Sequence, residues 1–228
     1  MDKGIFVLGT DTDIGKTFVS GLLLKKLRED GVNAGYFKAV LSGAEIEKER
    51  LIPGDCKFVC EVSGLKKDYD KMVSYTFKNP VSPHLASIIE GVDISFEKIK
   101  NDYINITKEY DFTLCEGSGG VICPISLADG NEIMLEDIVK MTNLPVILVA
   151  RAGLGTINHT FLTVNYLKQM GVSIKGIILN NFDKNSLMHN DNKKIIMKLT
   201  GIENIVTIPE TIDINDLNLD DLGRLIYG

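Results

Sequence analysis

The chain has 228 residues, of which 44% are hydrophobic and 25% are charged, a composition typical of a globular protein rather than a disordered or fibrous one. Its 25 basic and 31 acidic residues give a net charge of −6, which disfavours binding to nucleic acid because such binders carry a basic surface. No apolar run approaches the roughly 20 residues that span a membrane, and the first apolar segment has no signal-peptide core. We therefore predict a cytoplasmic protein of one domain over residues 1–228, with no nucleic acid or membrane partner.

Short apolar runs alternate along the chain with stretches of helical periodicity. The runs cover residues 4–8, 34–37, 112–115, 145–150, 174–179 and 205–208. Most are continuously apolar, as strands covered on both faces are. Two helices are clearly delimited, one over 17–28 that ends before Gly31 and one over about 156–170 that ends at Gly171. This order predicts an α/β fold, a mainly parallel sheet with helices on both faces.

The segment 41–83 is rich in charged and turn residues and has no clean periodicity. We predict loops and short helices there, lying over the sheet edge that ligands use. Its most charged part, residues 45–50, is interpreted as a solvent-exposed loop or helix face.

The most informative motif, G-T-D-T-D-I-G-K-T at residues 9–17, lies between the first strand and the first helix. In this context it predicts a P-loop, whose backbone N–H groups and helix N-terminus bind phosphate. Lys16 would reach the outer phosphates, and Thr17 would offer a hydroxyl to magnesium. Five residues separate Gly9 from Gly15 instead of the usual four, so the loop is a variant.

Charged side chains also follow other apolar runs. Lys38 and Glu116 each come directly after one of them. Because the carboxyl ends of parallel strands form the ligand crevice, Glu116 is a candidate magnesium ligand beside Thr17. Position alone does not decide whether Lys38 and Asp55 have a functional role. A lysine at a strand end is commonly solvated, and a loop aspartate commonly forms a turn or caps a helix.

Short motifs of glycine, proline and charged residues recur in the same order as in a known family. They lie at residues 35–43, 55, 80–84, 116–120 and 153–159. Together with the P-loop they closely resemble the dethiobiotin synthetases, which close a ureido ring on a vicinal diamine, and the resemblance covers nearly the whole chain. Asp13, Ala39 and Ser118 depart from the family pattern, where glutamate, proline and alanine are more usual, but none removes a group with an assigned chemical role.

The resemblance implies roles for particular residues. The catalytic groups would be Thr12, Lys16 and Lys38. The magnesium ligands would be Thr17, Asp55 and Glu116. The nucleotide would be bound by Asp13, Ile14, Gly15, Lys16, Thr17, Phe18, Glu116, Asn180, Pro209 and Glu210. The substrate would be bound by Thr12, Lys38, Ser42, Gly119, Gly155, Thr156, Ile157 and Asn158.

The resemblance also implies a reaction. The enzyme would use ATP and magnesium to carboxylate 7,8-diaminononanoate with carbon dioxide, passing through a carbamate and a carbamic-phosphoric anhydride to dethiobiotin, ADP and phosphate. Asn180 would bind adenine, although its N-N-F-D context weakly resembles a guanine-reading motif, so other triphosphates stay open. A homodimer is expected, in which residues 155–158 of one subunit bind the substrate carboxylate of the other.

Two alternatives share this broad fold. A partitioning-type nucleotide-switch ATPase would generally carry a second lysine inside the phosphate loop, and residues 10–14 contain none. An amide-forming ligase of the cobalamin pathway would normally bring a glutamine-hydrolysing domain, which 228 residues cannot easily hold.

Overall fold

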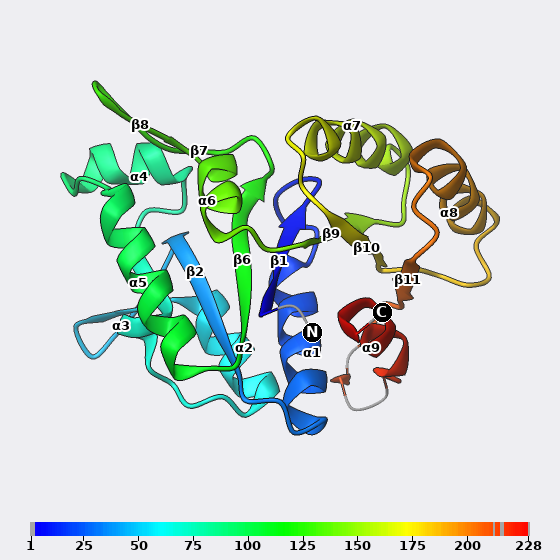
Figure 1. Cartoon of the computed structure of the whole chain (residues 1–228), viewed down its shortest axis with the longest axis horizontal. Helices are drawn as coiled ribbons and strands as arrows, with labels where there is room; N and C mark the ends of the chain where they lie inside the picture. Colours follow the sequence, from blue (N-terminus) through cyan, green and yellow to red (C-terminus); the bar gives the residue numbers. More distant parts are fainter. Residues whose placement is uncertain (1–2, 212, 215–216, 228) are drawn as a thin grey trace.

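A computed structural model describes residues 3–211, 213–214 and 217–227. Its main sheet is built from β1 (Gly4–Gly9), β2 (Ala34–Ser42), β5 (Val73–Phe77), β6 (Phe112–Gly120), β9 (Val146–Arg151), β10 (Ile174–Asn180) and β11 (Ile205–Ile208). The seven strands are all parallel and lie in the order β11-β10-β9-β1-β6-β2-β5 (Figure 1). The α/β fold predicted from the sequence is confirmed.

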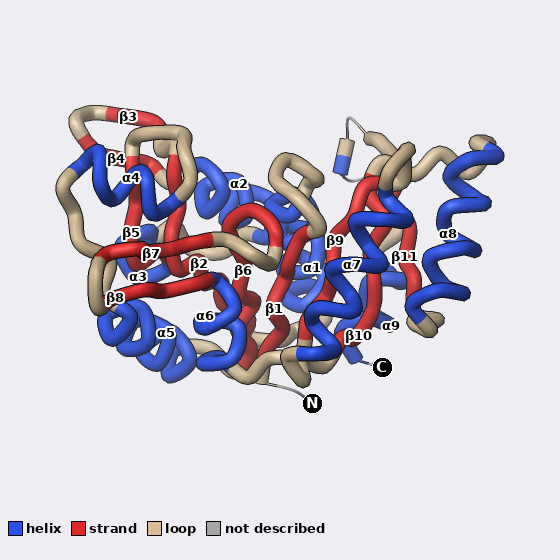
Figure 2. The backbone as a smooth tube through the Cα atoms, turned by 90° about the horizontal axis from the view of Figure 1, so that it is seen from above, coloured by secondary structure: helices blue, strands red, loops and turns tan. Residues whose placement is uncertain are grey.

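Helices cover both faces of this sheet. They are α1 (Lys16–Glu29), α2 (Gly54–Ser63), α3 (Tyr69–Met72), α4 (Pro83–Glu90), α5 (Phe96–Glu109), α6 (Leu135–Thr142), α7 (Thr156–Gln169), α8 (Leu187–Thr200) and α9 (Asp220–Tyr227). Helix α1 packs against α2 and α9, whereas α5 packs against α6 and α7 against α8 on the opposite face (Figures 1 and 2). Right-handed crossovers produce this division. The connections through α1 and α2 run along the sheet toward β5, whereas those through α5, α6, α7 and α8 run toward β11, and connections in opposite directions place their helices on opposite faces.

The apolar pattern explains the core. The strands are buried along most of their length, and α1 turns the stripe of Val19, Leu22, Leu23 and Leu27 inward. Strand β2 was predicted to end at residue 37 but continues to Ser42. It does so because β5 pairs with residues 38–42 and supplies backbone hydrogen-bonding partners for them. The apolar run in the sequence gives no sign of this pairing.

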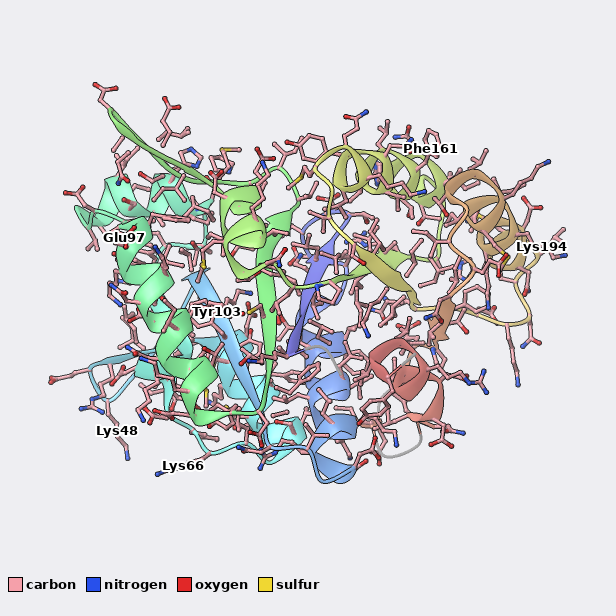
Figure 3. All side chains as sticks on the ribbon, in the orientation of Figure 1. Lys48, Lys66, Glu97, Tyr103, Phe161 and Lys194 are labelled. Atoms are coloured by element: carbon pink, nitrogen blue, oxygen red, sulfur yellow. The ribbon has the colours of Figure 1, made fainter. Side chains whose placement is uncertain are left out.

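The segment 41–83 is more ordered than predicted. Besides α2 and α3 it contains the edge strand β5 and a hairpin of β3 (Glu45–Glu47) and β4 (Arg50–Ile52), so the prediction of a loop or helix at 45–50 is wrong, although these residues are exposed. The turn residues Lys48 and Glu49 have φ of 49° and 66°. Such a turn is usually marked by Asn-Gly, which this sequence lacks. Lys48 lies at the outer edge of the molecule (Figure 3).

Two further features complete the fold. A second hairpin, β7 (Pro124–Ala128) and β8 (Asn131–Met134), projects beside α4 at the upper left of Figure 1. Within the described ranges, none of the helices has the length and apolar character needed to cross a membrane.

Candidate active site

The loop between β1 and α1 is fixed from its sides by side chains of neighbouring strands. Arg151 Nη2 donates to the Asp13 carbonyl over 3.0 Å, and Asn180 Nδ2 donates to the Ile14 carbonyl over 3.0 Å. Gly15 has a φ of 92°, and a Cβ there would lie 2.1 Å from Asn180 Nδ2. Only glycine therefore lets the loop close against Asn180.

Lys16, the first residue of α1, folds back over this loop. Its Nζ donates to the Asp11 carbonyl over 2.8 Å. Burial, followed by the positive charge of Lys38, lowers the pKa of Lys16. An ammonium held this way can exchange one carbonyl partner for a phosphate oxygen without being exposed to bulk water.

A cluster of charged and hydroxyl groups lies beside the loop. Lys38 and Glu116 are paired in register on β2 and β6, and Lys38 Nζ donates to Glu116 Oε1 over 2.7 Å. The same ammonium donates to Asp55 Oδ2. Thr17 Oγ1 donates to Glu116 Oε1 over 2.8 Å, and Tyr36 Oη donates to Glu116 Oε2 over 3.1 Å. Donors from β2 and α1 thus converge on the Glu116 carboxylate, and Asp55 of α2 joins the cluster through Lys38.

Neighbouring opposite charges in this cluster stabilise one another's charged forms. Burial opposes the charge of Lys38, but Glu116 and Asp55 together raise its pKa above the usual lysine value. Burial opposes the charge of Asp55 as well, yet the neighbouring Lys38 lowers the pKa of that carboxyl. Burial and then the charge of Glu116 raise the pKa of Tyr36 well above its ordinary value. At neutral pH the cluster therefore contains a charged lysine, a charged aspartate and a phenol that acts as a donor.

These groups open onto a cavity of about 780 Å³ at the carboxyl edge of the sheet. Its other wall is formed by residues 80–82, which lie between β5 and α4, and by Pro83, the first residue of α4. The predicted site residues that line it are Thr12, Asp13, Gly15, Lys16, Thr17, Lys38, Ser42, Asp55, Glu116 and Gly119. The structure thus brings together the predicted catalytic groups, the predicted metal ligands and part of both predicted binding sets.

Other predicted residues lie outside this cavity. Ile14, a residue of the loop, is buried, and the Phe18 ring packs against Phe58 of α2 at a centroid distance of 6.3 Å. Asn180 supports the loop and is paired in register with Ile208 at the end of β11. Pro209 and Glu210, the next two residues, are exposed at the same end of the sheet.

The predicted carboxylate-binding residues 155–158 also lie outside the cavity of their own chain. They begin α7, where Gly155 has a φ of 88°. Asn192 of α8 donates to the carbonyls of residues 152 and 153 over 2.9 and 3.2 Å and so braces this turn. Leu154 at its tip is 93% exposed.

Two placements made from the sequence need correction. Lys38 was placed at the end of a strand but lies inside β2, because pairing with β5 extends that strand. Asp55 was placed in a loop but lies in the first turn of α2, directly after Pro53 and Gly54. A fixed proline φ and an acidic residue near the helix N-terminus both favour a helix start there.

Tyr36 was not among the site residues predicted from the sequence. It lies inside an apolar run that reads as ordinary strand core. A polar group two residues before Lys38 on the same strand face is the signal that could have identified it.

Solved structures support the fold. A plasmid partition protein from Borrelia burgdorferi aligns with a TM-score of 0.58 at 13% identity, covering 98% of this chain and 96% of that one. A MinC:MinD cell division protein complex from Aquifex aeolicus aligns with a TM-score of 0.55 at 14% identity, covering 98% and 86%. At these identities the likeness shows the fold alone.

Sequence relatives are far more similar. Residues 3–217 match the family described as AAA domain. The chain is 53% identical over 216 residues to the ATP-dependent dethiobiotin synthetase BioD of Clostridium novyi, covering 95% of this chain and 91% of the relative. It is 59% identical over 228 residues to the protein of the same name from Clostridium perfringens ATCC 13124, covering 100% of both. From this full-length identity we conclude that the chain belongs to the ATP-dependent dethiobiotin synthetases, as the sequence motifs predicted.

Proposed function

We propose that this ligase forms dethiobiotin from 7,8-diaminononanoate, carbon dioxide and ATP in three steps. One amine adds to carbon dioxide and loses a proton, giving a carbamate. A carbamate oxygen then attacks the γ-phosphorus of ATP, and the bond to the β-phosphate oxygen breaks as ADP leaves. The second amine attacks the carbamoyl carbon and loses a proton, the carbon–oxygen bond to phosphate breaks, and the ureido ring closes.

The observation that carries this proposal is the convergence of Lys16, Lys38 and two carboxylates on one cavity beside the phosphate loop. Lys16 and the loop hold the triphosphate, and Lys38 stabilises the carbamate and its phosphorylated form. Thr12, Ser42 and Gly119 line the same cavity and orient the diamine. No residue has to form a covalent bond to substrate, because phosphoryl transfer is catalysed mainly by positioning and electrostatics.

The donor set beside the loop suits magnesium. Thr17 Oγ1 and Glu116 Oε1 are 2.8 Å apart, and the Lys38 ammonium donates hydrogen bonds to both the Asp55 and the Glu116 carboxylates. Magnesium prefers hard oxygen ligands of this type and retains several waters. We therefore infer that Thr17, Asp55 and Glu116 hold the ion. When bound, it neutralises negative charge on the phosphate oxygens.

Asn180 supports ATP as the nucleotide. Its Nδ2 is engaged by the Ile14 carbonyl, while its Oδ1 is buried and has no hydrogen-bond partner among the described residues. A free amide oxygen can accept a hydrogen bond from the 6-amino group of adenine. Pro209 and Glu210, at the same end of the sheet, would contact the base or ribose.

We further propose a homodimer with a shared site, each subunit being one domain over residues 1–228. The substrate carries two amines at one end and a carboxylate at the other, so it needs a second anion site beyond the phosphate loop. The start of α7, with Gly155, Thr156, Ile157 and Asn158, offers N–H groups of a helix N-terminus but does not line the cavity of its own chain. In a two-fold symmetric dimer, the start of α7 of one subunit would bind the substrate carboxylate in the cavity of the other.

Substrate dependence tests the reaction. ADP release should require both the diamine and bicarbonate, and mass spectrometry should detect one dethiobiotin per ADP. ATP hydrolysis that is independent of the diamine would instead favour a nucleotide switch.

Subunit mixing tests the shared site. Lys38→Met and Thr156→Pro proteins, each strongly impaired alone, should regain activity when mixed, because heterodimers contain one intact site. A fully active monomer in sedimentation, or no recovery despite confirmed subunit exchange, contradicts the shared site.

A further inference from the structure

A buried phenol beside the carboxylate cluster has no part in the proposed reaction. Tyr36 is fully buried on β2, and its hydroxyl donates to Glu116 Oε2 over 3.1 Å. Alternation along the strand places Tyr36 on the same face as Lys38, which is paired with Glu116 on β6. Tyr36 is therefore a diagonal cross-strand neighbour of Glu116, within reach of a long aromatic side chain.

The two oxygens of Glu116 have different partners. Oε1 accepts from Thr17 Oγ1 and Lys38 Nζ at 2.8 and 2.7 Å, whereas Oε2 accepts from Tyr36. The terminal torsion of a glutamate side chain has broad minima, so the rotamer alone does not fix the plane of the carboxylate. A donor on a rigid ring that is fully enclosed by the core does fix it.

We propose that Tyr36 is a positioning residue, which orients the Glu116 carboxylate so that Oε1 faces Thr17 and the metal–nucleotide complex. This inference rests on the proposed function in one respect, namely that Glu116 binds the metal. Hydrogen-bond partners of ligating carboxylates set the orientation of the ligand, and their replacement typically lowers metal affinity or activity by about 10–100-fold.

The substitution Tyr36→Phe tests this role because it deletes one oxygen and keeps the ring in the core. Mn²⁺ binding to the protein–ADP complex, followed by electron paramagnetic resonance, gives a readout that does not depend on turnover. We expect the Mn²⁺ dissociation constant to rise about 10-fold. The affinity for ADP in EDTA should stay unchanged, and the metal concentration for half-maximal activity should rise by the same factor as the dissociation constant.

A matched control is Tyr103→Phe. Tyr103, labelled in Figure 3, packs its ring against Phe37 at a centroid distance of 5.7 Å. Phe37 is next to Tyr36 in sequence and therefore points to the opposite face of the sheet. The control thus removes a phenol oxygen from a half-buried ring that packs against the core on the face away from Glu116, and its Mn²⁺ affinity should match that of the unmodified protein.

The outcomes separate this inference from the proposed function. An unchanged Mn²⁺ dissociation constant in folded Tyr36→Phe, or equal shifts in both tyrosine variants, overturns the positioning role. Glu116→Gln is measured alongside. If it weakens Mn²⁺ binding and Tyr36→Phe does not, only the positioning role fails; if Glu116→Gln binds Mn²⁺ normally, the metal assignment of the proposed function fails with it.

Discussion

Replacing Lys38 by methionine keeps a long unbranched side chain and removes its charge. Glu116, whose side chain is 1% exposed, then loses its cationic partner, whereas Asp55, at 38% exposed, can be hydrated. Breaking a buried ion pair costs about 3–5 kcal/mol, and the lower end applies here because Thr17 and Tyr36 still donate to Glu116. For a chain of this size, about 3 kcal/mol corresponds to a fall of about 6–12 °C in melting temperature.

The effect of Lys38→Met on catalysis should exceed its effect on nucleotide binding. Losing one charge contact made in the transition state costs about 10²–10³-fold in kcat. Lys16 and the backbone of the phosphate loop still hold the nucleotide, so its affinity should fall only slightly. Calorimetry with ADP measures the affinity, and mass spectrometry of dethiobiotin measures ring closure.

The control for this substitution is Lys57→Met, on the same helix as Asp55. Lys57 Nζ pairs with Glu47 Oε1 over 2.6 Å at the surface, and such pairs contribute about 0–1 kcal/mol. Its turnover and melting temperature should stay close to those of the unmodified protein. Equal losses of affinity and turnover in Lys38→Met would assign that lysine to phosphate binding, and an unchanged melting temperature would refute the buried-pair argument.

Three further changes probe the same site. Thr17→Val replaces the hydroxyl with a methyl group, so magnesium-dependent turnover should drop about 10²-fold or more while the protein still folds; normal turnover would contradict the metal assignment. Gly15→Ala places a methyl group 2.1 Å from Asn180 Nδ2 at a φ of 92°, so calorimetry should detect no nucleotide binding. Asp55 has a folded-state pKa below its unfolded value of 3.8, so its stabilisation is present above that value and is lost as the pH falls through the folded pKa. Urea unfolding at graded acidic pH should show this loss in the unmodified protein and a smaller one in Asp55→Asn.

The phosphate loop and the α/β fold could be predicted from the sequence because both depend on patterns of residues that are neighbours in the sequence. Lys16 and Thr17 follow a glycine at the junction of an apolar run and an amphipathic stretch, and the structure has a strand and a helix there. Burial of that strand on both faces requires a continuous apolar run, which is visible without knowing its neighbours.

Features that depend on distant partners could not be predicted. The length of β2 depends on β5, about 35 residues later, and β5 is not a continuous apolar run but alternates apolar and polar residues over only five positions. Tyr36 and Glu116 are 80 positions apart, and their hydrogen bond exists only because β2 and β6 are neighbours in the sheet. Strand order determines such contacts, and the periodicity of a single segment does not predict it.

The charged residues that line the cavity are two lysines and three carboxylates, Lys16 and Lys38 against Asp13, Asp55 and Glu116. The chain as a whole carries −6. An anionic nucleotide therefore meets no long-range attraction on its approach, unlike substrates whose association is accelerated about 10–10³-fold by a field of opposite sign. Capture depends instead on short-range donors that act after arrival, so added salt should leave the association rate nearly constant or raise it by screening the repulsion.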